Sequence, residues 1–213
     1  MSQHHLHSAL AQSFTQRNIN KISDIEIDAG THRACRGGNP LSLRVAYRDA
    51  HGRRLLSALL DQSLQPLHSL QPLHDTVAWG ERRIPLSYGH HHGGRVSAFP
   101  GEPLLRTESH LERLALQHFA GLPGCRALLT QPLTIRFDFR GTRRRYTPDL
   151  LVLLDPVPID LARAGFDPLT LVEVKPPRAR MDLELWTARA CALREALGLP
   201  LVRFPFICVE GRI

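Results

Sequence analysis

The order in which helix and strand patterns follow one another after residue 107 constrains the fold of this chain more than any other feature. Apolar residues recur at helical spacing over 107–119, where Thr107 has the character of an N-cap and a glycine and a proline follow. Alternating apolar and polar residues over 133–139 predict a strand. The turn sequence RGTR at 140–143 then leads into a second strand over 146–154. We therefore expect one helix followed by a β-hairpin.

A strand, a helix and a further strand are predicted after the hairpin. The apolar run LTLVEV at 169–174 is typical of a strand, and two prolines end it. A helix is expected over 181–197, with Gly198 as its C-cap. A last strand is expected over 201–209. The order of one helix, three strands, one helix and one strand predicts an α/β domain in which helices flank a mixed sheet.

The sequence before this region indicates a second, smaller unit. Gly, Pro and polar residues gather over 88–106 and suggest a boundary, so we expect two domains, 1–95 and 96–213. Short strands are predicted over 25–29 and 41–47. The consecutive hexapeptides LQPLHS and LQPLHD each contain a proline and predict an irregular connector. The first domain is therefore expected to be a small α+β module or an extended arm.

Composition favours a soluble protein with a polyanionic partner. Hydrophobic residues make up 43% of the 213 residues, as in a globular protein, and no apolar run approaches the ~18 residues of a membrane helix. The polar start shows no signal-peptide pattern, so we expect a cytoplasmic protein. The net charge of +7 indicates a nucleic-acid partner. Only Lys21 and Lys175 are lysines among the 27 basic residues, and this arginine bias fits phosphate recognition and genome composition equally well.

Two acids and a lysine interrupt the apolar strands at defined places. Asp149 follows Pro148 in the strand predicted over 146–154. Glu173 and Lys175 are two residues apart, so their side chains emerge on the same face of the next strand. If the strands are neighbours, both carboxylates face one region, where they would form an oxygen-rich site for Mg²⁺ or Mn²⁺. With a lysine beside them, these groups suit metal-assisted hydrolysis of a phosphodiester.

A glutamate of the first helix joins this set. At about 100° per residue, Glu112 lies within the apolar stripe of the helix, where a carboxylate is costly unless it is paired or metal-bound. Glu108 lies nearer the helix start, where the macrodipole accounts for it. Alone, a Pro-Asp or a Glu-x-Lys is more often structural. Their occurrence together and in this order favours a functional site.

These residues carry a resemblance to a known superfamily. Glu112, then Pro148-Asp149, then Glu173-Val174-Lys175 on an αβββαβ core resemble the PD-(D/E)xK nucleases, which have the restriction-endonuclease-like fold. The strings ESHLERLALQHFAGLPGCRALLTQPLTIRF, RRRYTPDLLVLL and LVEVKP most resemble the TnsA-type endonuclease subunit of heteromeric transposases. The similarity runs from about residue 95 to about residue 207.

The resemblance implies a role for each matched residue. Glu112, Asp149 and Glu173 would bind two Mg²⁺ or Mn²⁺ ions with the carbonyl of Val174. Lys175 would position the attacking water or stabilise the pentacoordinate phosphate. Gln131, in the Gln-Pro sequence that opens a strand, would line the site.

Arginines flank the expected site on both sides. Three precede the strand of Asp149 and two follow Lys175; they are Arg143, Arg144, Arg145, Arg178 and Arg180. Such a rim suits the phosphates of double-stranded DNA. The alternative for a run of charges is an exposed, solvated face. No residue in the set predicts base reading, so we expect sequence specificity to come from a partner.

The resemblance also implies partners. A TnsA-type subunit cleaves the 5′ ends of a transposable element, while a separate DDE-type transposase cuts and joins the 3′ ends and an AAA+ ATPase acts as regulator. Better-known members continue into a winged-helix-type domain, whereas this sequence ends at Ile213, and residues 1–95 match no pattern of the family. A stand-alone nuclease of DNA repair or restriction and a non-catalytic DNA-binding assembly subunit are the alternatives.

Overall fold

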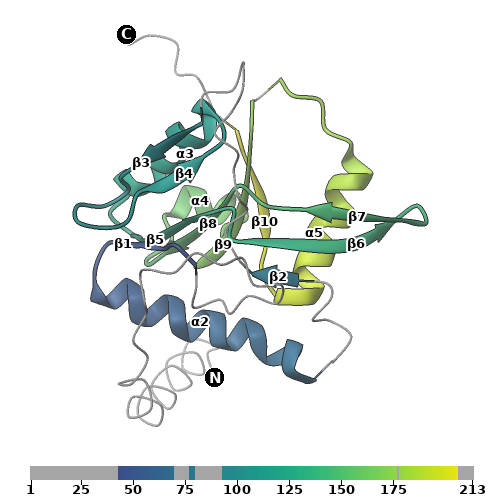
Figure 1. The fold of residues 1–213 in the computed structure, drawn as a ribbon, viewed down its shortest axis with the longest axis horizontal. Helices are drawn as coiled ribbons and strands as arrows, with labels where there is room; N and C mark the ends of the chain where they lie inside the picture. Colours follow the sequence, from purple (N-terminus) through teal and green to yellow (C-terminus); the bar gives the residue numbers. More distant parts are fainter. Residues whose placement is uncertain (1–42, 70–76, 80–92, 177, 206–213) are drawn as a thin grey trace, which may run out of the picture. The chain divides into compact units, whose positions relative to one another are not determined.

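The computed structural model describes residues 43–69, 77–79, 93–176 and 178–205. These residues form a mixed α/β structure in which helices flank a mixed sheet (Figure 1). The strand predicted over 25–29 and residues 206–209 of the last predicted strand lie outside the described residues. None of the described helices is long and apolar enough to cross a membrane.

A five-stranded sheet forms the centre of the fold. Its strands, in spatial order, are β1 (Ala46–Tyr47), β5 (Cys125–Thr130), β8 (Leu150–Leu154), β9 (Leu169–Lys175) and β10 (Leu201–Pro205). The first four strands pair antiparallel, whereas β10 pairs parallel with β9. The parallel pair requires a crossover, which the helix between β9 and β10 provides.

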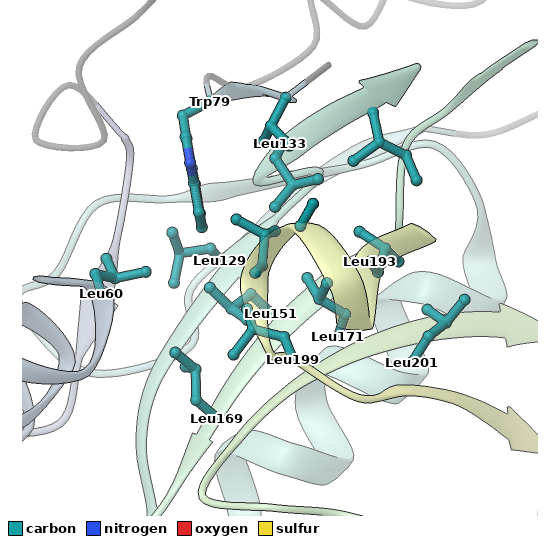
Figure 2. Packing of buried hydrophobic residues seen from close by; sticks show 14 of the residues in the cluster. Leu60, Trp79, Leu129, Leu133, Leu151, Leu169, Leu171, Leu193, Leu199 and Leu201 are labelled. Atoms are coloured by element: carbon teal, nitrogen blue, oxygen red, sulfur yellow. The ribbon is translucent and has the colours of Figure 1, made fainter. Parts of the chain in front are cut away.

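Both faces of this sheet are buried, which explains why its central strands are apolar without interruption. Alternate residues of each strand point to opposite faces. On one face, Leu129, Leu151 and Leu171 pack with α2 (Ala50–Ser69) and α5 (Leu183–Leu197) (Figure 2). The other face packs on α3 (His110–Gly121) and α4 (Ile159–Arg163), through Leu128, Leu150, Val152 and Val172 among others.

Two smaller sheets complete the described part of the fold. β2 (Val77–Trp79), β6 (Leu133–Phe139) and β7 (Thr142–Tyr146) form an antiparallel three-stranded sheet, and β3 (Gly94–Val96) pairs with β4 (Leu105–Thr107). Figure 1 shows α3 beside β3 and β4, and α5 beside β6 and β7. The hairpin of β6 and β7 turns at Arg140 and Gly141, which both have positive φ, 52° and 71°, as a two-residue type I′ turn requires.

The hairpin differs from the predicted one in a way that matters for the site. The predicted strand over 133–139 is confirmed, but the strand expected over 146–154 is two strands in different sheets. β7 ends at Tyr146, β8 begins at Leu150, and Pro148 and Asp149 lie in the break between them. β8 pairs with β5 on one side and with β9 on the other, and β5 was not predicted because its sequence, CRALLT, does not alternate between apolar and polar residues.

The helix ends are set by capping groups. Thr107 ends β4, and the N-cap of α3 is Ser109, whose Oγ accepts the N–H of Glu112 at 3.2 Å. The prediction of Thr107 as N-cap was therefore wrong by two residues. α5 begins after Asp182, which accepts the N–H of Leu185. Its predicted end at Gly198 is confirmed, with φ 69°, a conformation in which glycine has no steric penalty.

Residues before the boundary predicted near 95 belong to the same sheets as those after it. β1 pairs with β5, and β2 pairs with β6. α2 was not predicted, and its last turn contains the first LQPLHS sequence, which we expected to be irregular. The hydrogen-bonded sheets thus join the described residues on both sides of 95.

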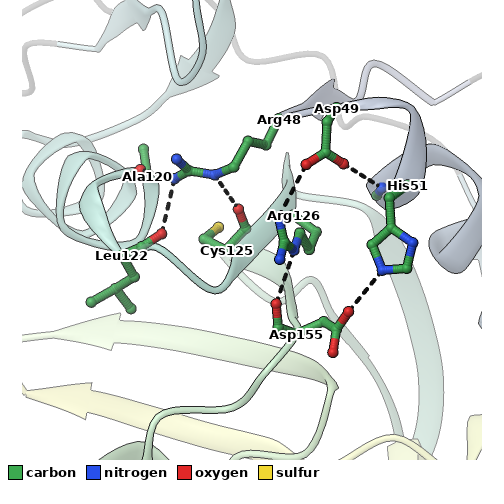
Figure 3. Close-up of polar contacts among 9 residues, drawn as sticks. Arg48, Asp49, His51, Ala120, Leu122, Cys125, Arg126 and Asp155 are labelled. Carbon is green, nitrogen blue, oxygen red and sulfur yellow. Dashed lines mark hydrogen bonds and ion pairs between the residues drawn. The ribbon is translucent and has the colours of Figure 1, made fainter.

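Arg48 fixes β1 to the end of α3. Its guanidinium donates hydrogen bonds to the carbonyls of Ala120, Leu122 and Cys125, and the Arg48 N–H donates to the carbonyl of Arg126 (Figure 3). Carbonyls at a helix C-terminus have no partner within the helix. A single arginine therefore supplies donors to three carbonyls at this turn, of which that of Leu122 also accepts the N–H of Cys125.

The start of α2 is held to the same part of the fold by two ion pairs. Asp49 accepts the N–H of Gly52 at 2.7 Å and pairs with Arg126 at 3.0 Å. His51 Nε2 lies 2.7 Å from Asp155, at the end of β8 (Figure 3). Polar contacts thus join α2, β5 and the end of β8.

Candidate active site

Asp149 is held in the break between two sheets by its backbone and by its side chain. Its N–H donates to the carbonyl of Val172 at 3.0 Å, and its carbonyl accepts the N–H of Gln131 at 2.8 Å. Its carboxylate accepts the N–H of Val174 at 2.7 Å. The side chain of Asp149, in the break that follows β7, therefore lies against β9.

Glu173 and Lys175 face Asp149 from β9. Lys175 Nζ lies 3.2 Å from Glu173 Oε1 and 3.9 Å from Asp149 Oδ2. The side chains of Glu173 and Asp149 are 6% and 14% exposed, whereas that of Lys175 is 47% exposed. The expected convergence of these three groups is thus present: Glu173 is buried, Asp149 is mostly buried, and the ammonium of Lys175 beside them is half-exposed.

Burial and the neighbouring charges bring the pKa of Asp149 close to neutral pH. Burial, followed by the charge of Glu173, raises the pKa of Asp149 to about 7, although Lys175 and the Val174 N–H oppose this. Burial acts to lower the pKa of Lys175, but the charges of Asp149 and Glu173 outweigh it and raise that pKa overall. The lysine stays charged, and it does not fully neutralise the two acids.

Tyr146 and Arg189 complete the surroundings of Glu173, and the sequence analysis missed both. The hydroxyl of Tyr146 donates a hydrogen bond to Glu173 Oε2. Arg189, from α5, places its guanidinium 3.8 Å from Glu173 Oε1 and 4.4 Å from the centre of the Tyr146 ring. Tyr146 reads as an ordinary strand residue and Arg189 is one of many arginines, so neither carried a signal.

Glu112 approaches the site from the other side of the sheet. It belongs to α3, and its carboxylate accepts the N–H of Glu108 at 2.8 Å and the hydroxyl of Ser109 at 2.9 Å. This is a variant of the capping box, which satisfies helix N–H groups. Burial raises the pKa of the Glu112 carboxyl group above its usual value. The contacts of Glu112 in this structure are thus those of a helix cap.

A cavity of about 580 Å³ lies over the carboxylates. Its lining includes the predicted residues Gln131, Arg145, Asp149, Glu173 and Lys175, together with Glu108, Thr134, Tyr146, Thr147 and Arg189. Gln131 is 2% exposed with φ 47°, a strained conformation for a residue other than glycine. Such strain is common beside functional sites.

The arginine rim is brought to the site only in part. Arg145 lines this cavity, and Arg180 lines an adjoining one. Arg143, Arg144 and Arg178 are exposed and are not among the lining residues of these two cavities. Arg144 instead places its guanidinium 5.4 Å from the centre of the Phe139 ring.

The donor set at Asp149 and Glu173 fits a hard divalent cation. The N–H and C=O groups of one strand residue point to the same edge, so the Val174 carbonyl points towards Asp149, whose carboxylate accepts the Val174 N–H. Carboxylate and carbonyl oxygens are the ligands that Mg²⁺ and Mn²⁺ prefer. Among the described residues, no three His, Cys, Asp or Glu side chains form one metal-holding group. A cation here would therefore take two carboxylates and backbone oxygen.

Comparison with known proteins does not place the chain in a family. No protein-family model matches it, and no curated protein is significantly similar to it. The chemistry assigned to this site therefore depends on the geometry of its own residues.

Proposed function

We propose that this protein is a metal-dependent endonuclease that hydrolyses phosphodiester bonds of double-stranded DNA. The observation that carries the proposal is the convergence of Asp149 and Glu173, whose side chains are 14% and 6% exposed, with Lys175 in the lining of a cavity. Lys175 and Arg189 both lie within 4 Å of Glu173, yet burial and the charge of Glu173 still raise the pKa of Asp149 to about 7, so a further cation beside Asp149 would stabilise its charged form. The basic rim and the net charge of +7 favour a polyanionic substrate.

The arrangement of the central elements supports a restriction-endonuclease-like core. In chain order α3, β5, β8, β9, α5 and β10 follow the αβββαβ pattern, and β6 and β7 are an insertion between its first two strands. Asp149 directly precedes the second of these strands, and Glu173 and Lys175 lie in the third. This is the order of acids and lysine that a PD-(D/E)xK nuclease would have.

The residues of the site divide the chemistry between them. Asp149, Glu173 and the Val174 carbonyl would hold the two Mg²⁺ or Mn²⁺ ions. When bound, such ions neutralise the charge that develops on the attacking and leaving oxygens of a phosphodiester. Lys175, with its half-exposed ammonium, would orient the attacking water or the phosphate oxygens. Glu112 would have to exchange its contacts with Glu108 and Ser109 to become a third acidic ligand.

The biological setting we propose is DNA transposition. In this role the chain is a TnsA-type subunit that cleaves the 5′ ends of a transposable element in the cytoplasm. It acts beside a DDE-type transposase, under an AAA+ ATPase regulator. The resemblance of the strings around Glu112, Asp149 and Glu173 supports this setting. A stand-alone nuclease of repair or restriction is the second candidate, and it differs in cutting DNA without a transposase.

Metal binding tests the proposal without a partner. Mn²⁺ is titrated by calorimetry into the full chain and into Asp149→Ala, with Asp160→Ala as a control because the side chain of Asp160, on α4, is 90% exposed. We expect binding to the wild type and the control, and a loss of at least tenfold in affinity for Asp149→Ala. Equal binding to all three proteins would place the metal elsewhere and contradict the proposed site.

DNA cleavage tests the chemistry. In Mn²⁺, nicking of plasmid DNA by the full chain, alone and with transposase subunits, is compared with nicking by Lys175→Ala. Activity that is lost in Lys175→Ala supports the proposed roles. Metal binding at Asp149 with undiminished nicking by Lys175→Ala would refute the role given to the lysine.

A further inference from the structure

A second, smaller cavity adjoins the candidate active site on the side of α5. It has a volume of about 250 Å³ and shares Glu173, Lys175 and Arg189 with the larger cavity. Its other lining residues come from the loop after β9, from α5 and from β10; they are Arg180, Met181, Asp182, Leu185, Trp186 and Arg203. A DNA strand that passes over Lys175 would therefore have a cavity on each side of this side chain.

One wall of the smaller cavity is apolar and partly open to solvent. Trp186 and Leu185 are half-buried on α5, and Met181 is 44% exposed. Leu183, in the first turn of α5, is 65% exposed. Met181 and Leu183 are two of the four large apolar side chains that are exposed among the described residues. Trp186 packs in part against the core and also lines the cavity, where its indole beside Leu185 and Met181 suits contact with a flat, aromatic ligand.

Arg180 and Arg203 are basic residues of the same lining, which also contains the acids Glu173 and Asp182, and Arg203 belongs to β10. Arg203 donates hydrogen bonds to the carbonyls of Pro176 and Ala179, both at 3.0 Å. The N–H of Ala179 also donates to the carbonyl of Pro176 at 3.0 Å. The turn that carries Arg180 is thus fixed at both ends. Arg180 itself is exposed at the rim of the cavity.

We propose that this cavity holds one unstacked nucleotide of the cleaved DNA strand, with its base against Trp186 and its phosphate at Arg180. This inference rests on the proposed function, because the phosphodiester over Lys175 determines which nucleotide reaches the cavity. A base inside a duplex is stacked and paired, so it must leave the helix to lie against α5. The site is therefore built for DNA ends that are single-stranded or distorted beside the cleavage point.

The combination of aromatic and basic residues in the lining favours a nucleotide as the ligand. A backbone phosphate is recognised by arginine, and aromatic side chains stack on bases without regard to sequence. Both kinds of side chain line one cavity, which shares Glu173, Lys175 and Arg189 with the candidate active site. An aromatic or acidic side chain of a protein partner is the competing occupant, and the experiment below separates it.

Tryptophan fluorescence tests the inference, because the chain has two tryptophans. Trp79 is 6% exposed in the core, whereas Trp186 lines the cavity. The full chain is titrated in EDTA with a paired duplex and with a duplex of the same length that ends in a short single-stranded tail. We expect the tailed DNA to bind at least fivefold more tightly and to quench the emission.

Variants assign the signal to the cavity. Trp186→Phe keeps an aromatic face, so the preference for the tail should remain within about twofold while the quenching disappears. Trp186→Ala should lower the affinity for the tailed duplex about tenfold, the scale of one base–aromatic stack. Ile159→Ala removes an exposed apolar side chain on α4 that lies outside the lining of both cavities, 67% exposed, and should behave as wild type.

The outcomes separate this inference from the proposed function. EDTA prevents metal-dependent cleavage, so a preference for the tail that depends on Trp186 supports the nucleotide site even if the nuclease assay fails. Cleavage by wild type with equal affinity for both duplexes, or quenching that persists in Trp186→Phe, overturns the inference alone. DNA binding that Trp186→Ala leaves unchanged also overturns it and favours a protein side chain as occupant.

Discussion

Replacement of Asp149 by asparagine should stabilise the protein at alkaline pH while it removes an acid of the site. Burial and the nearby charge of Glu173 raise the pKa of Asp149 from 3.8 to about 7. Between these values the native state binds a proton that the unfolded state has lost, so stability falls as the pH rises. At about 1.4 kcal/mol for each pH unit, the shift from 3.8 to about 7 corresponds to about 4 kcal/mol lost above pH 7.

The asparagine variant has no such penalty, because its amide is neutral and its oxygen can still accept the N–H of Val174. From pH 5 to pH 8 the wild type should therefore lose about 3 kcal/mol more stability than Asp149→Asn, since part of the penalty is already present at pH 5. Urea denaturation in EDTA at five pH values measures this difference. Asp160→Asn, at a carboxylate that is 90% exposed, is the matched control and should follow the wild type.

Divalent cation supplies a second arm of the same experiment. Mn²⁺ at about 100 times its Kd should raise the free energy of unfolding of the wild type at pH 8 by about 3 kcal/mol, because it binds only the folded site. It should have little effect on Asp149→Asn. Parallel stability curves of wild type and Asp149→Asn from pH 5 to pH 9 would refute the conclusion that the buried acids are incompletely neutralised.

Three further substitutions, one of them with a matched control, test contacts at the turn between α3 and β5 and at the candidate site. A Cβ at position 124 would lie 2.3 Å from the carbonyl oxygen of Pro156, whereas a Cβ at position 121 meets nothing within 4 Å. In urea denaturation, Gly124→Ala should therefore destabilise the protein by at least about 2 kcal/mol. Gly121→Ala is the control and should destabilise it by less than about 0.5 kcal/mol. Arg48→Ala removes the guanidinium that donates to the carbonyls of Ala120, Leu122 and Cys125, of which that of Leu122 keeps the N–H of Cys125. It should lower the midpoint of thermal unfolding, a loss of about 1–3 kcal/mol. Tyr146→Phe removes the hydroxyl that donates to Glu173 and should destabilise the protein by about 1–3 kcal/mol at pH 8. Unchanged unfolding of Arg48→Ala or of Tyr146→Phe would show that the hydrogen bonds removed in that variant contribute nothing to stability.

Elements with a strong local signal were predictable from the sequence. The strand over 133–139 alternates, and α5 ends at a glycine with positive φ, so both follow from short-range rules. The facing of Glu173 and Lys175 follows from the two-residue period of a strand. β5 and α2 were missed, because a nearly continuous apolar segment and a proline-containing helix resemble connections until their tertiary partners are known.

The candidate site could be predicted in its acids and lysine but not in their supporting contacts. The break after Tyr146 depends on which sheet each half of the segment joins, and no local pattern distinguishes a strand from two strands in different sheets. Arg189 reaches Glu173 only because α5 packs on that face of the sheet. The capping contacts of Glu112 depend on a helix start two residues later than predicted. The first two features thus depend on long-range packing, whereas the Ser109-x-x-Glu112 capping box is a local signal that the sequence contained.

The turn of the β6–β7 hairpin offers a practical place to attach a probe. Arg140 occupies a left-handed position that favours asparagine or glycine, so Arg140→Gly is expected to be tolerated by the backbone. Its side chain contacts Phe139 and Glu184, which lie outside the residues that line the two cavities. A cysteine or a short recognition tag introduced between residues 140 and 141 would be carried on the strand that contains Tyr146. Cross-linking from that position would report which stretch of DNA or which partner lies along the hairpin during turnover.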